Sequence, residues 1–375
     1  MDKFRLLQKI NRAGKRFHLV FLTDLFNLLV RGVLPQMKIR MMPKEARAIL
    51  NRLSPDPAST SIWDNSLLPY RYDLGIVVPA YNVEQYIGQC IDSILGQKTQ
   101  YTFRLIIVED GSTDQTPHLL KKYEQLAGVS VIYQKNQGVS AARNRALQKI
   151  DFRYVMFVDS DDYIPENCVE RLLSKALAHD ADIVEGGYFY VNEEKSLPYL
   201  HKDSKKVNAS KVFTGYPWGK VIKSTFFKSL CFPQGYWFED SILTYLIYPV
   251  STKSYTLADP VYFYRMNKDG IVQRSVNHPK SIDSFWVTEQ LIKDIKSLEL
   301  PIGNELYRQL LQEVKVNFLR VQQMDKEVRH ALFVLTCDLF ERELSTHFAD
   351  VTDLQDLEKA IRTKDYVRYC MSCCG

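Results

Sequence analysis

The run Tyr154-Val155-Met156-Phe157-Val158-Asp159-Ser160-Asp161-Asp162 has an apolar half typical of a buried strand and closes in three carboxylates. Like charges this close together repel one another unless something neutralises them. Carboxylate oxygens are ligands that Mg²⁺ and Mn²⁺ prefer. The run therefore predicts a strand whose end holds a divalent cation and, through it, a phosphorylated substrate. The alternative is an acidic helix N-cap formed by Asp161 or Asp162.

Short apolar runs alternate with helical patterns on both sides of this stretch. The runs with the length and composition of strands are Leu74–Val78, Phe103–Val108, Val129–Tyr133, Tyr154–Val158 and Ile183–Val191. The helical patterns between them are Glu84–Gln97, Asp114–Ala127, Ser140–Lys149 and Glu166–His179. This alternation predicts an α/β fold with a mostly parallel sheet covered by helices on both faces. Such sheets bind ligands at the carboxyl ends of their strands.

The rest of the chain has a different character. Prolines and small polar residues between 53 and 71 indicate a linker. Beyond Pro279, amphipathic patterns predict helices at Ser281–Leu298, Asn304–Met324, Lys326–Leu344 and Asp353–Tyr369. We therefore expect a basic helical extension and linker at 1–70, an α/β domain at 71–278 and a C-terminal helical module at 279–375.

Positive charge is concentrated at the N-terminus. Of the 375 residues, the first fifty carry eleven lysines or arginines against Asp2, Asp24 and Glu45, a net of +8, while the whole chain is at +5. This distribution indicates a local anionic partner and argues against a nucleic-acid-binding protein. Residues 17–34 form an amphipathic pattern too polar for a confident transmembrane helix. Either residues 1–50 contact a membrane interface, or this helix packs on the protein or on a second subunit.

The seven cysteines are an odd number and are mostly far apart. Cys90, Cys168, Cys231 and Cys337 lie near apolar residues, which favours buried reduced thiols and a cytoplasmic location. The tail carries Cys370, Cys373 and Cys374. It lacks a second ligand cluster, so a zinc site there is disfavoured.

Candidate binding residues follow the first, second and third strands of the alternation. Tyr81 offers a face on which a base can stack, and Asp110 can accept a hydrogen bond from a pyrimidine ring N–H. Arg143 can donate to the other edge of the base or to phosphate. A loop aromatic, a turn and a surface charge are the structural alternatives for each residue taken singly. Their common position at strand ends favours binding.

Four motifs at these positions resemble an inverting glycosyltransferase of the large family-2 group, which has the GT-A fold. They are Ile76-Val-Val-Pro-Ala-Tyr-Asn, Val108-Glu-Asp-Gly-Ser-Thr-Asp, Asn136-Gln-Gly-Val-Ser-Ala-Ala-Arg-Asn and Phe157-Val-Asp-Ser-Asp-Asp. Further on, Trp218-Gly-Lys220 and the segment ending in Glu239-Asp240 resemble acceptor-side segments of that family. The resemblance covers residues 74 to 275, a little over half the chain, and one visible departure is Ala146, where many relatives have glycine.

The resemblance implies a role for each matching residue. Nucleotide-binding residues would be Pro79, Ala80, Tyr81, Asp110, Arg143, Asp159 and Ser160. Asp161 would hold Mn²⁺ or Mg²⁺, and Asp240 of the Glu239-Asp240 pair would be the general base. Candidates for contact with the diphosphate or the acceptor are Trp218, Lys220, Trp237 and Arg265, with Gln273, Arg274 and Ser275 in a loop that aligns loosely.

The function implied is inverting transfer of a sugar from a nucleotide-diphospho-sugar, with UDP expected, to a hydroxyl of a glycan or lipid-linked acceptor. A cytoplasmic enzyme at the inner face of the membrane, building a bacterial surface polysaccharide, fits this expectation. The alternative is a catalytically silent nucleotide- or glycan-binding scaffold of the same fold. Nucleotidyltransferases and dinucleotide-dependent oxidoreductases are disfavoured, because no glycine-rich phosphate loop follows the first strand. The sugar, the acceptor and the oligomeric state are left open.

Overall fold

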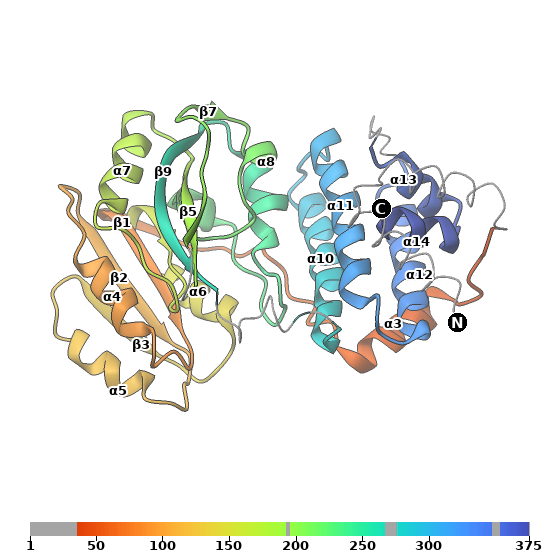
Figure 1. Ribbon diagram of the computed structural model, residues 1–375, viewed down its shortest axis with the longest axis horizontal. Helices are drawn as coiled ribbons and strands as arrows, with labels where there is room; N and C mark the ends of the chain where they lie inside the picture. The colour runs from red at the N-terminus through yellow and green to blue at the C-terminus, as the bar shows by residue number, and fades with distance from the viewer. Residues whose placement is uncertain (1–35, 193–195, 267–274, 276, 347–352, 375) are drawn as a thin grey trace. The chain divides into compact units, whose positions relative to one another are not determined.

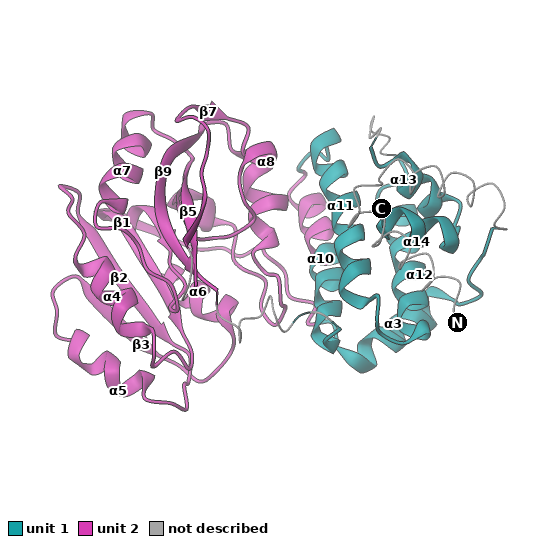
Figure 2. Ribbon diagram, in the orientation of Figure 1, with its two compact units in different colours: residues 1–56, 271–289, 300–375 teal, residues 57–270, 290–299 magenta. Residues whose placement is uncertain are grey.

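The computed structural model describes residues 36–192, 196–266, 275, 277–346 and 353–374. These residues form two compact units (Figure 2). The larger unit takes the described residues of 57–270 and 290–299, and the smaller takes those of 1–56, 271–289 and 300–375. The chain thus divides into two units in space, whereas the sequence predicts three consecutive parts.

Within the described residues, the larger unit is built on one nine-stranded mixed sheet (Figure 1). Its strands are β1 (Leu67–Ala80), β2 (Phe103–Glu109), β3 (Val129–Tyr133), β4 (Ile150–Phe157), β5 (Ile183–Val191), β6 (Ser196–Tyr199), β7 (Lys206–Val207), β8 (Lys220–Lys223) and β9 (Ser254–Arg265). Eight of them lie in the order β3-β2-β1-β4-β8-β5-β9-β7, with β6 pairing with β5. Strands β1 to β4 are parallel, and β8 is antiparallel to both β4 and β5.

Helices cover both faces of this sheet because both faces of its strands are apolar. Alternate residues of β1, such as Ile76 and Val78, share a buried cluster with residues of α4 (Ile87–Leu95) and α7 (Cys168–Ala178). On the opposite face, Phe157 of β4 contacts Phe227 and Phe232 edge-on, and α6 (Val139–Leu147) packs over β1 and β2. The α/β class and the two-sided cover predicted from the sequence are confirmed.

Several predicted boundaries are wrong. Strand β1 begins at Leu67, inside the stretch predicted as a linker. The helix predicted after β2 shortens to α5 (Thr116–Leu120) and one 3₁₀ turn, Lys121–Tyr123. The last predicted helix is two helices, α13 (Gln355–Arg362) and α14 (Tyr366–Cys374), separated by Lys364 with φ +54°. A residue in this left-handed conformation ends a helix.

The smaller unit is helical in its described residues. Beside α13 and α14 it contains α3 (Pro43–Leu53), α11 (Asn304–Val321) and α12 (Lys326–Glu343), and α3 packs against α12. Arg47 of α3 donates to Glu289 at 2.6 Å, at the sixth position after Asp283 in α10 (Asp283–Ser297). The segment predicted as part of an N-terminal extension therefore shares a core with helices almost 300 residues away.

Two further sequence predictions concern a membrane-contacting helix and the state of the cysteines. The amphipathic pattern at 17–34 lies outside the described residues. Within the described part of the chain, no helix combines the length and the apolar composition that a membrane crossing requires. Cys90, Cys168, Cys231, Cys337, Cys370 and Cys373 are buried free thiols, and Cys374 is a partly buried one.

Candidate functional site

The candidate site lies at the edge of the sheet where β1, β2 and β4 end. Ala80 pairs with Glu109 in the parallel register, and Val77 pairs with Phe157, so the three chains leave the sheet side by side. Pro79 and Ala80, predicted to bind nucleotide, are the buried last residues of β1. Tyr81 follows them with 47% of its surface exposed. Of these three residues, Tyr81 is the one whose side chain can meet a ligand.

The loops after β1 and β2 are tied together by hydrogen bonds. The Asn82 Oδ1 atom accepts from the Thr113 N–H at 2.8 Å, and the Ser112 hydroxyl accepts from the Asn82 N–H at 3.0 Å. Asn82 has φ +50°, a conformation that asparagine tolerates better than most residues. Glu84 in turn accepts from the Gln115 N–H at 2.8 Å. Tyr81 therefore rises from a loop whose backbone is held in place.

Asp110 is buried and already accepts three hydrogen bonds within the protein. Its Oδ1 accepts from the Gln134 side chain at 2.7 Å and from the Gln137 N–H at 2.9 Å, and its Oδ2 accepts from the Gly138 N–H at 2.8 Å. A carboxylate offers about four lone-pair positions, so capacity for one further donor is left on Oδ2. The predicted hydrogen bond from a nucleotide base to Asp110 would therefore have to go to Oδ2. The anchoring of the 134–138 loop is a role that the sequence reading missed.

Arg143 lies in α6 with its guanidinium buried between two acidic segments. Nη1 donates to Glu239 at 2.6 Å and Nη2 donates to Asp159 at 3.1 Å. Burial acts to lower the pKa of Arg143, but Glu239, Asp159 and Asp240 outweigh it, so the pKa is raised. The neighbouring Asn144 adds an amide pair to the backbone of Phe232, at 2.8 and 2.9 Å. Helix α6 therefore positions both acidic segments, a role not foreseen for Arg143.

The three carboxylates after β4 lie in different environments. Asp159 is partly exposed beside Arg143, and the neighbouring Ser160 is buried. Asp162 is buried, accepting from the Tyr262 hydroxyl at 2.8 Å and from the Arg265 N–H at 2.7 Å. Burial first, and then Asp161 and Asp159, raise the pKa of Asp162 well above its usual range. Asp162 therefore fastens the run to β9, and the ligand roles of Asp159 and Asp161 stay predictions.

Glu239 and Asp240 stand at the entrance of a helical segment. Phe238 has φ +68°, and the Asp240 carbonyl accepts from the Leu243 N–H at 3.0 Å, so the helix starts directly after the acidic pair. Glu239 is buried against Arg143, whereas Asp240 is only partly buried. The nearby Trp237 is also partly buried. Asp240 is therefore the less buried of the two carboxylates, and its role as general base stays a prediction.

Trp218 and Lys220, two candidates for contact with the diphosphate or the acceptor, are both buried. Trp218 is 3% exposed, sandwiched between Tyr216 and Tyr262 with ring centroids 4.6 and 4.5 Å away. Its ring packs against other aromatic rings, and its contact with the diphosphate or the acceptor stays a prediction. Tyr262 was missed, although the alternation within Asp259–Arg265 places Tyr262 and Tyr264 on one face of a strand.

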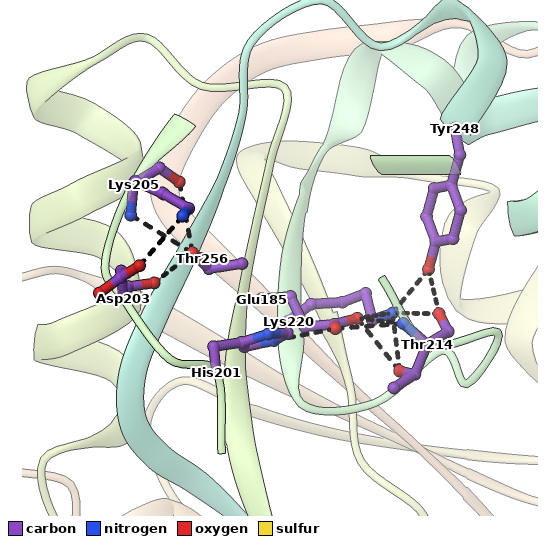
Figure 3. A network of polar contacts seen from close by, with 8 residues as sticks. All are labelled: Glu185, His201, Asp203, Lys205, Thr214, Lys220, Tyr248 and Thr256. Atoms are coloured by element: carbon purple, nitrogen blue, oxygen red, sulfur yellow. Dashed lines mark hydrogen bonds and ion pairs between the residues drawn. The ribbon is translucent and has the colours of Figure 1, made fainter. Parts of the chain in front are cut away.

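Lys220 is fully buried in the polar network drawn in Figure 3. Its Nζ pairs with Glu185 of β5 and donates to the Tyr248 hydroxyl at 2.6 Å and to the Thr214 carbonyl at 2.9 Å. Burial lowers the pKa of Lys220, although Glu185 opposes the shift. His201 contacts the other Glu185 oxygen at 3.1 Å. With its ammonium group bonded on these sides and closed to solvent, Lys220 is part of a buried polar network, and its contact with diphosphate or acceptor stays a prediction.

Arg265 is the basic candidate that reaches the surface of the site. Its guanidinium donates to Gln89 at 2.6 Å and lies 4.6 Å from the ring centre of Tyr86. Its backbone N–H holds Asp162, so the side chain starts beside the acidic run. Gln273 and Arg274 lie outside the described residues, and Ser275 is buried.

The donor set fits a divalent cation that is shared with a substrate. Among the described residues, no three His, Cys, Asp or Glu side chains are arranged to hold a metal ion unaided. Mg²⁺ is commonly held by one or two carboxylates together with substrate phosphates. Asp161, with Asp159 beside it, supplies hard oxygen ligands of that kind at the end of β4. A cation here would depend on the phosphates for the rest of its coordination.

Comparison with known proteins gives consistent matches. Residues 75–235 match the model of "Glycosyl transferase family 2". Glycosyltransferase GlyA of Streptococcus pneumoniae serotype 4 is 35% identical over 215 residues, 52% of this chain and 31% of GlyA. Glycosyltransferase GlyG of the same organism is 27% identical over 68% of this chain and 91% of GlyG. The chain thus spans under a third of one relative and nearly all of the other.

A solved structure shares the fold. The crystal structure of Staphylococcus aureus TarS 1–349 superposes with a TM-score of 0.66 at 22% identity, over 80% of this chain and 90% of that one. The same fragment of TarS has been solved in complex with UDP-GlcNAc and with UDP. At this identity the likeness establishes the fold.

Proposed function

We propose that the protein transfers a sugar from a nucleotide-diphospho-sugar to an acceptor hydroxyl with inversion, because its residues 75–235 match the glycosyl transferase family 2 model. The observation that carries the proposal is the bridge made by Arg143 between Asp159 and Glu239. This bridge joins the acidic run that would meet the diphosphate to the acidic pair that would meet the acceptor. A uridine donor is the first to test, because TarS has been solved with UDP-GlcNAc.

Each residue has a defined task in the proposed reaction. Tyr81 stacks against the base, while Asp110 keeps the loop before α6 in place and offers its remaining lone pair. Arg143 holds Asp159 and Glu239 in fixed positions. Asp240 takes the proton of the acceptor hydroxyl while the oxygen of that hydroxyl attacks the anomeric carbon of the donor sugar. The bond from that carbon to the diphosphate breaks on the opposite face, which inverts the anomeric configuration.

A Mg²⁺ or Mn²⁺ held by Asp161 would neutralise charge on the leaving diphosphate. Arg265, beside the acidic run, is positioned to add positive charge on the same side. The nucleotide leaves with the electron pair of the broken bond, and the proton remains on Asp240 until solvent takes it.

Thermal unfolding with added nucleotides tests the donor site. Purified protein is unfolded with UDP, GDP or dTDP, each with and without Mn²⁺, beside the Asp161→Ala variant. A ligand at about one hundred times its Kd adds about 2.7 kcal/mol to the unfolding free energy. We expect stabilisation by UDP that depends on Mn²⁺ and is lost in the variant. No stabilisation by any of the nucleotides would favour the silent scaffold instead.

The proposed place of reaction is the inner surface of the membrane, where the acceptor would be linked to a lipid. Residues 1–35 carry seven lysines or arginines against Asp2 and Asp24, and basic segments of this kind bind anionic headgroups. Because α3 packs within the smaller unit, a truncation should stop at residue 35 and leave α3 intact. We expect the full chain to bind vesicles containing phosphatidylglycerol and the truncated chain to lose that binding. Equal binding by the two proteins would contradict the membrane role.

A further inference from the structure

Three tyrosine rings stack against Trp218 on one side of the site. Tyr216 lies on one side of Trp218, with centroids 4.6 Å apart and planes 7° apart, and Tyr262 lies at 4.5 Å and 9°. Tyr264 is stacked against the same Trp218 at 5.2 Å and 17°. Parallel rings at these separations are mutually stabilising. The stack therefore holds its two partly exposed members, Tyr216 and Tyr264, in fixed orientations.

The stack joins the two chemical ends of the site. At one end the Tyr262 hydroxyl donates to Asp162 and accepts from the Asp159 N–H at 3.0 Å. At the other end the segment carrying Tyr216 packs against the helical turns that follow Asp240. A Cβ placed on Gly215 would lie 3.6 Å from the Thr244 hydroxyl oxygen, and the Tyr248 hydroxyl donates to the Thr214 carbonyl at 2.6 Å.

The members of this aromatic group differ in their access to solvent. Trp218 and Tyr262 are buried, whereas Tyr190, Tyr216 and Tyr264 are partly exposed. Tyr190 and Tyr264 face each other across β5 and β9 with ring centroids 5.7 Å apart, and the Tyr190 hydroxyl lies 3.0 Å from that of Tyr188. Burial raises the pKa of Tyr216, with Tyr190 and Asp240 adding to the shift.

We propose that Tyr190, Tyr216 and Tyr264 form a binding site for the sugar or polyol ring of the acceptor. The inference rests on the proposed function and specifies the part of the substrate that these residues recognise. Aromatic faces pack against the C–H surface of a ring, and phenolic hydroxyls exchange hydrogen bonds with its hydroxyl groups. The segment carrying Tyr216 packs against the turns that follow Asp240, so a ring held here would lie on the side of the site that carries the proposed base.

The sheet order favours the acceptor over the donor as the occupant. Tyr81 and Asp110, the proposed nucleotide-binding residues, follow β1 and β2 on one side of β4. The three tyrosines belong to β5, β9 and the segment before β8, all on the other side of β4. The acidic run at the end of β4 lies between the two groups. A donor held by its base and diphosphate would therefore approach from the side opposite the tyrosines.

Saturation-transfer NMR tests the assignment on the full-length protein with UDP and Mn²⁺ present. The probes are ribitol, cellobiose and methyl N-acetyl-β-glucosaminide, each at millimolar concentration. Tyr216→Ala and Tyr264→Ala are compared with Tyr70→Ala, a control at an exposed tyrosine near the opposite end of β1. Losing one stacked ring should weaken binding about five- to tenfold. Retained stabilisation by UDP shows that a variant is folded.

We expect at least one probe to bind the wild type and the Tyr70→Ala control, and to bind both site variants more weakly. The acceptor site would be overturned if the site variants bound the probes as well as the wild type does. It would also be overturned if no probe bound the wild type, or if the variants lost affinity only for the UDP-sugar. In those cases UDP stabilisation of the wild type would still support the proposed transferase. Absence of that stabilisation would instead count against the transferase itself.

Discussion

Arg143 of α6 and Glu239, ninety-six residues later, form a buried ion pair with 2.6 Å between Nη1 and Oε1. The guanidinium also reaches Asp159 at 3.1 Å and lies over the ring of Phe232, 5.2 Å from its centre. A single side chain thus links a helix, the end of a buried strand and the acidic pair before the next helix. The proposed donor and acceptor sides of the site share one support.

Replacing Arg143 by methionine should destabilise the larger unit. Removing one partner of a buried pair leaves an uncompensated charge, at a cost of about 3–5 kcal/mol. Guanidinium unfolding followed by fluorescence measures the change, with Arg145→Met, an exposed arginine of the same helix, as control. We expect the double variant Arg143→Met/Glu239→Gln to recover part of the loss. Equal stability of the Arg143 and Arg145 variants would contradict the assigned support.

Asp240→Asn should lower turnover of the donor sugar by roughly 10²–10⁴-fold, the usual contribution of a positioned base. The amide keeps the shape of the side chain, so UDP-dependent stabilisation should remain. The assay measures UDP released from a UDP-sugar in the presence of acceptor. Asp203→Asn, at an exposed carboxylate paired with Lys205, is the control and should be close to wild type. Near-normal turnover by the Asp240 variant would assign the base to another residue.

Lys220→Met should destabilise the protein by about 3–5 kcal/mol, because Glu185 would remain buried without its ammonium partner. Lys223→Met on the same strand removes a more exposed pair with Asp180 and should cost at most about 1 kcal/mol. Urea unfolding compares the two variants. A similar midpoint shift for both would mean that the Glu185 network contributes no more than a surface contact.

His330 should make the smaller unit sensitive to acid. Burial first, and then Lys326 and Arg329, lower the pKa of His330 from 6.5 to about 4. Between pH 6.5 and about 4, the His330 imidazole is protonated in the unfolded chain but stays neutral in the folded chain. The free energy of unfolding therefore falls as the pH drops below 6.5. His330→Gln should flatten this fall in unfolding measured at pH 7 and pH 5. His118→Gln, at an exposed histidine, should leave the slope unchanged.

Gly111→Ala should destabilise the turn after β2. Gly111 has φ +73°, and an added Cβ would lie 2.7 Å from the backbone nitrogen of Asn136. The left-handed conformation alone costs about 1–2 kcal/mol for alanine. Gly303→Ala, where a Cβ would meet nothing within 4 Å, is the matched control for thermal unfolding. An equal melting temperature for the two variants would show that the turn relaxes freely.

The α/β class and the edge of the sheet that carries the site were predictable from the order of residues along the chain. The apolar runs that became β2 and β3 match the predicted strands to within one residue. Such strands can be predicted because a short apolar run and the turn that follows it are both encoded by residues adjacent in the sequence. The strands that were missed include β8, which has only four residues, and β9 (Ser254–Arg265), although the alternation at 259–265 was a local signal for it.

The candidate site also combines residues whose positions were predictable from the sequence with contacts that were not. Tyr81, Asp159 and Asp161 lie at strand ends, where sequence spacing alone puts them. The burial of Lys220 against Glu185, the stacking of Trp218 between Tyr216 and Tyr262, and the fastening of Asp162 by Tyr262 could not be read in this way. Each of these contacts joins strands distant in the sequence.

Local composition therefore determined the α/β class, the parallel strands at one side of the sheet and the position of the acidic run. Tertiary packing decided which polar residues are support and which face a ligand. The physical reason is that a lysine or a tryptophan has the same intrinsic chemistry wherever it stands in the chain. Its role depends on whether distant partners remove it from water, as Glu185 and Tyr248 do for Lys220.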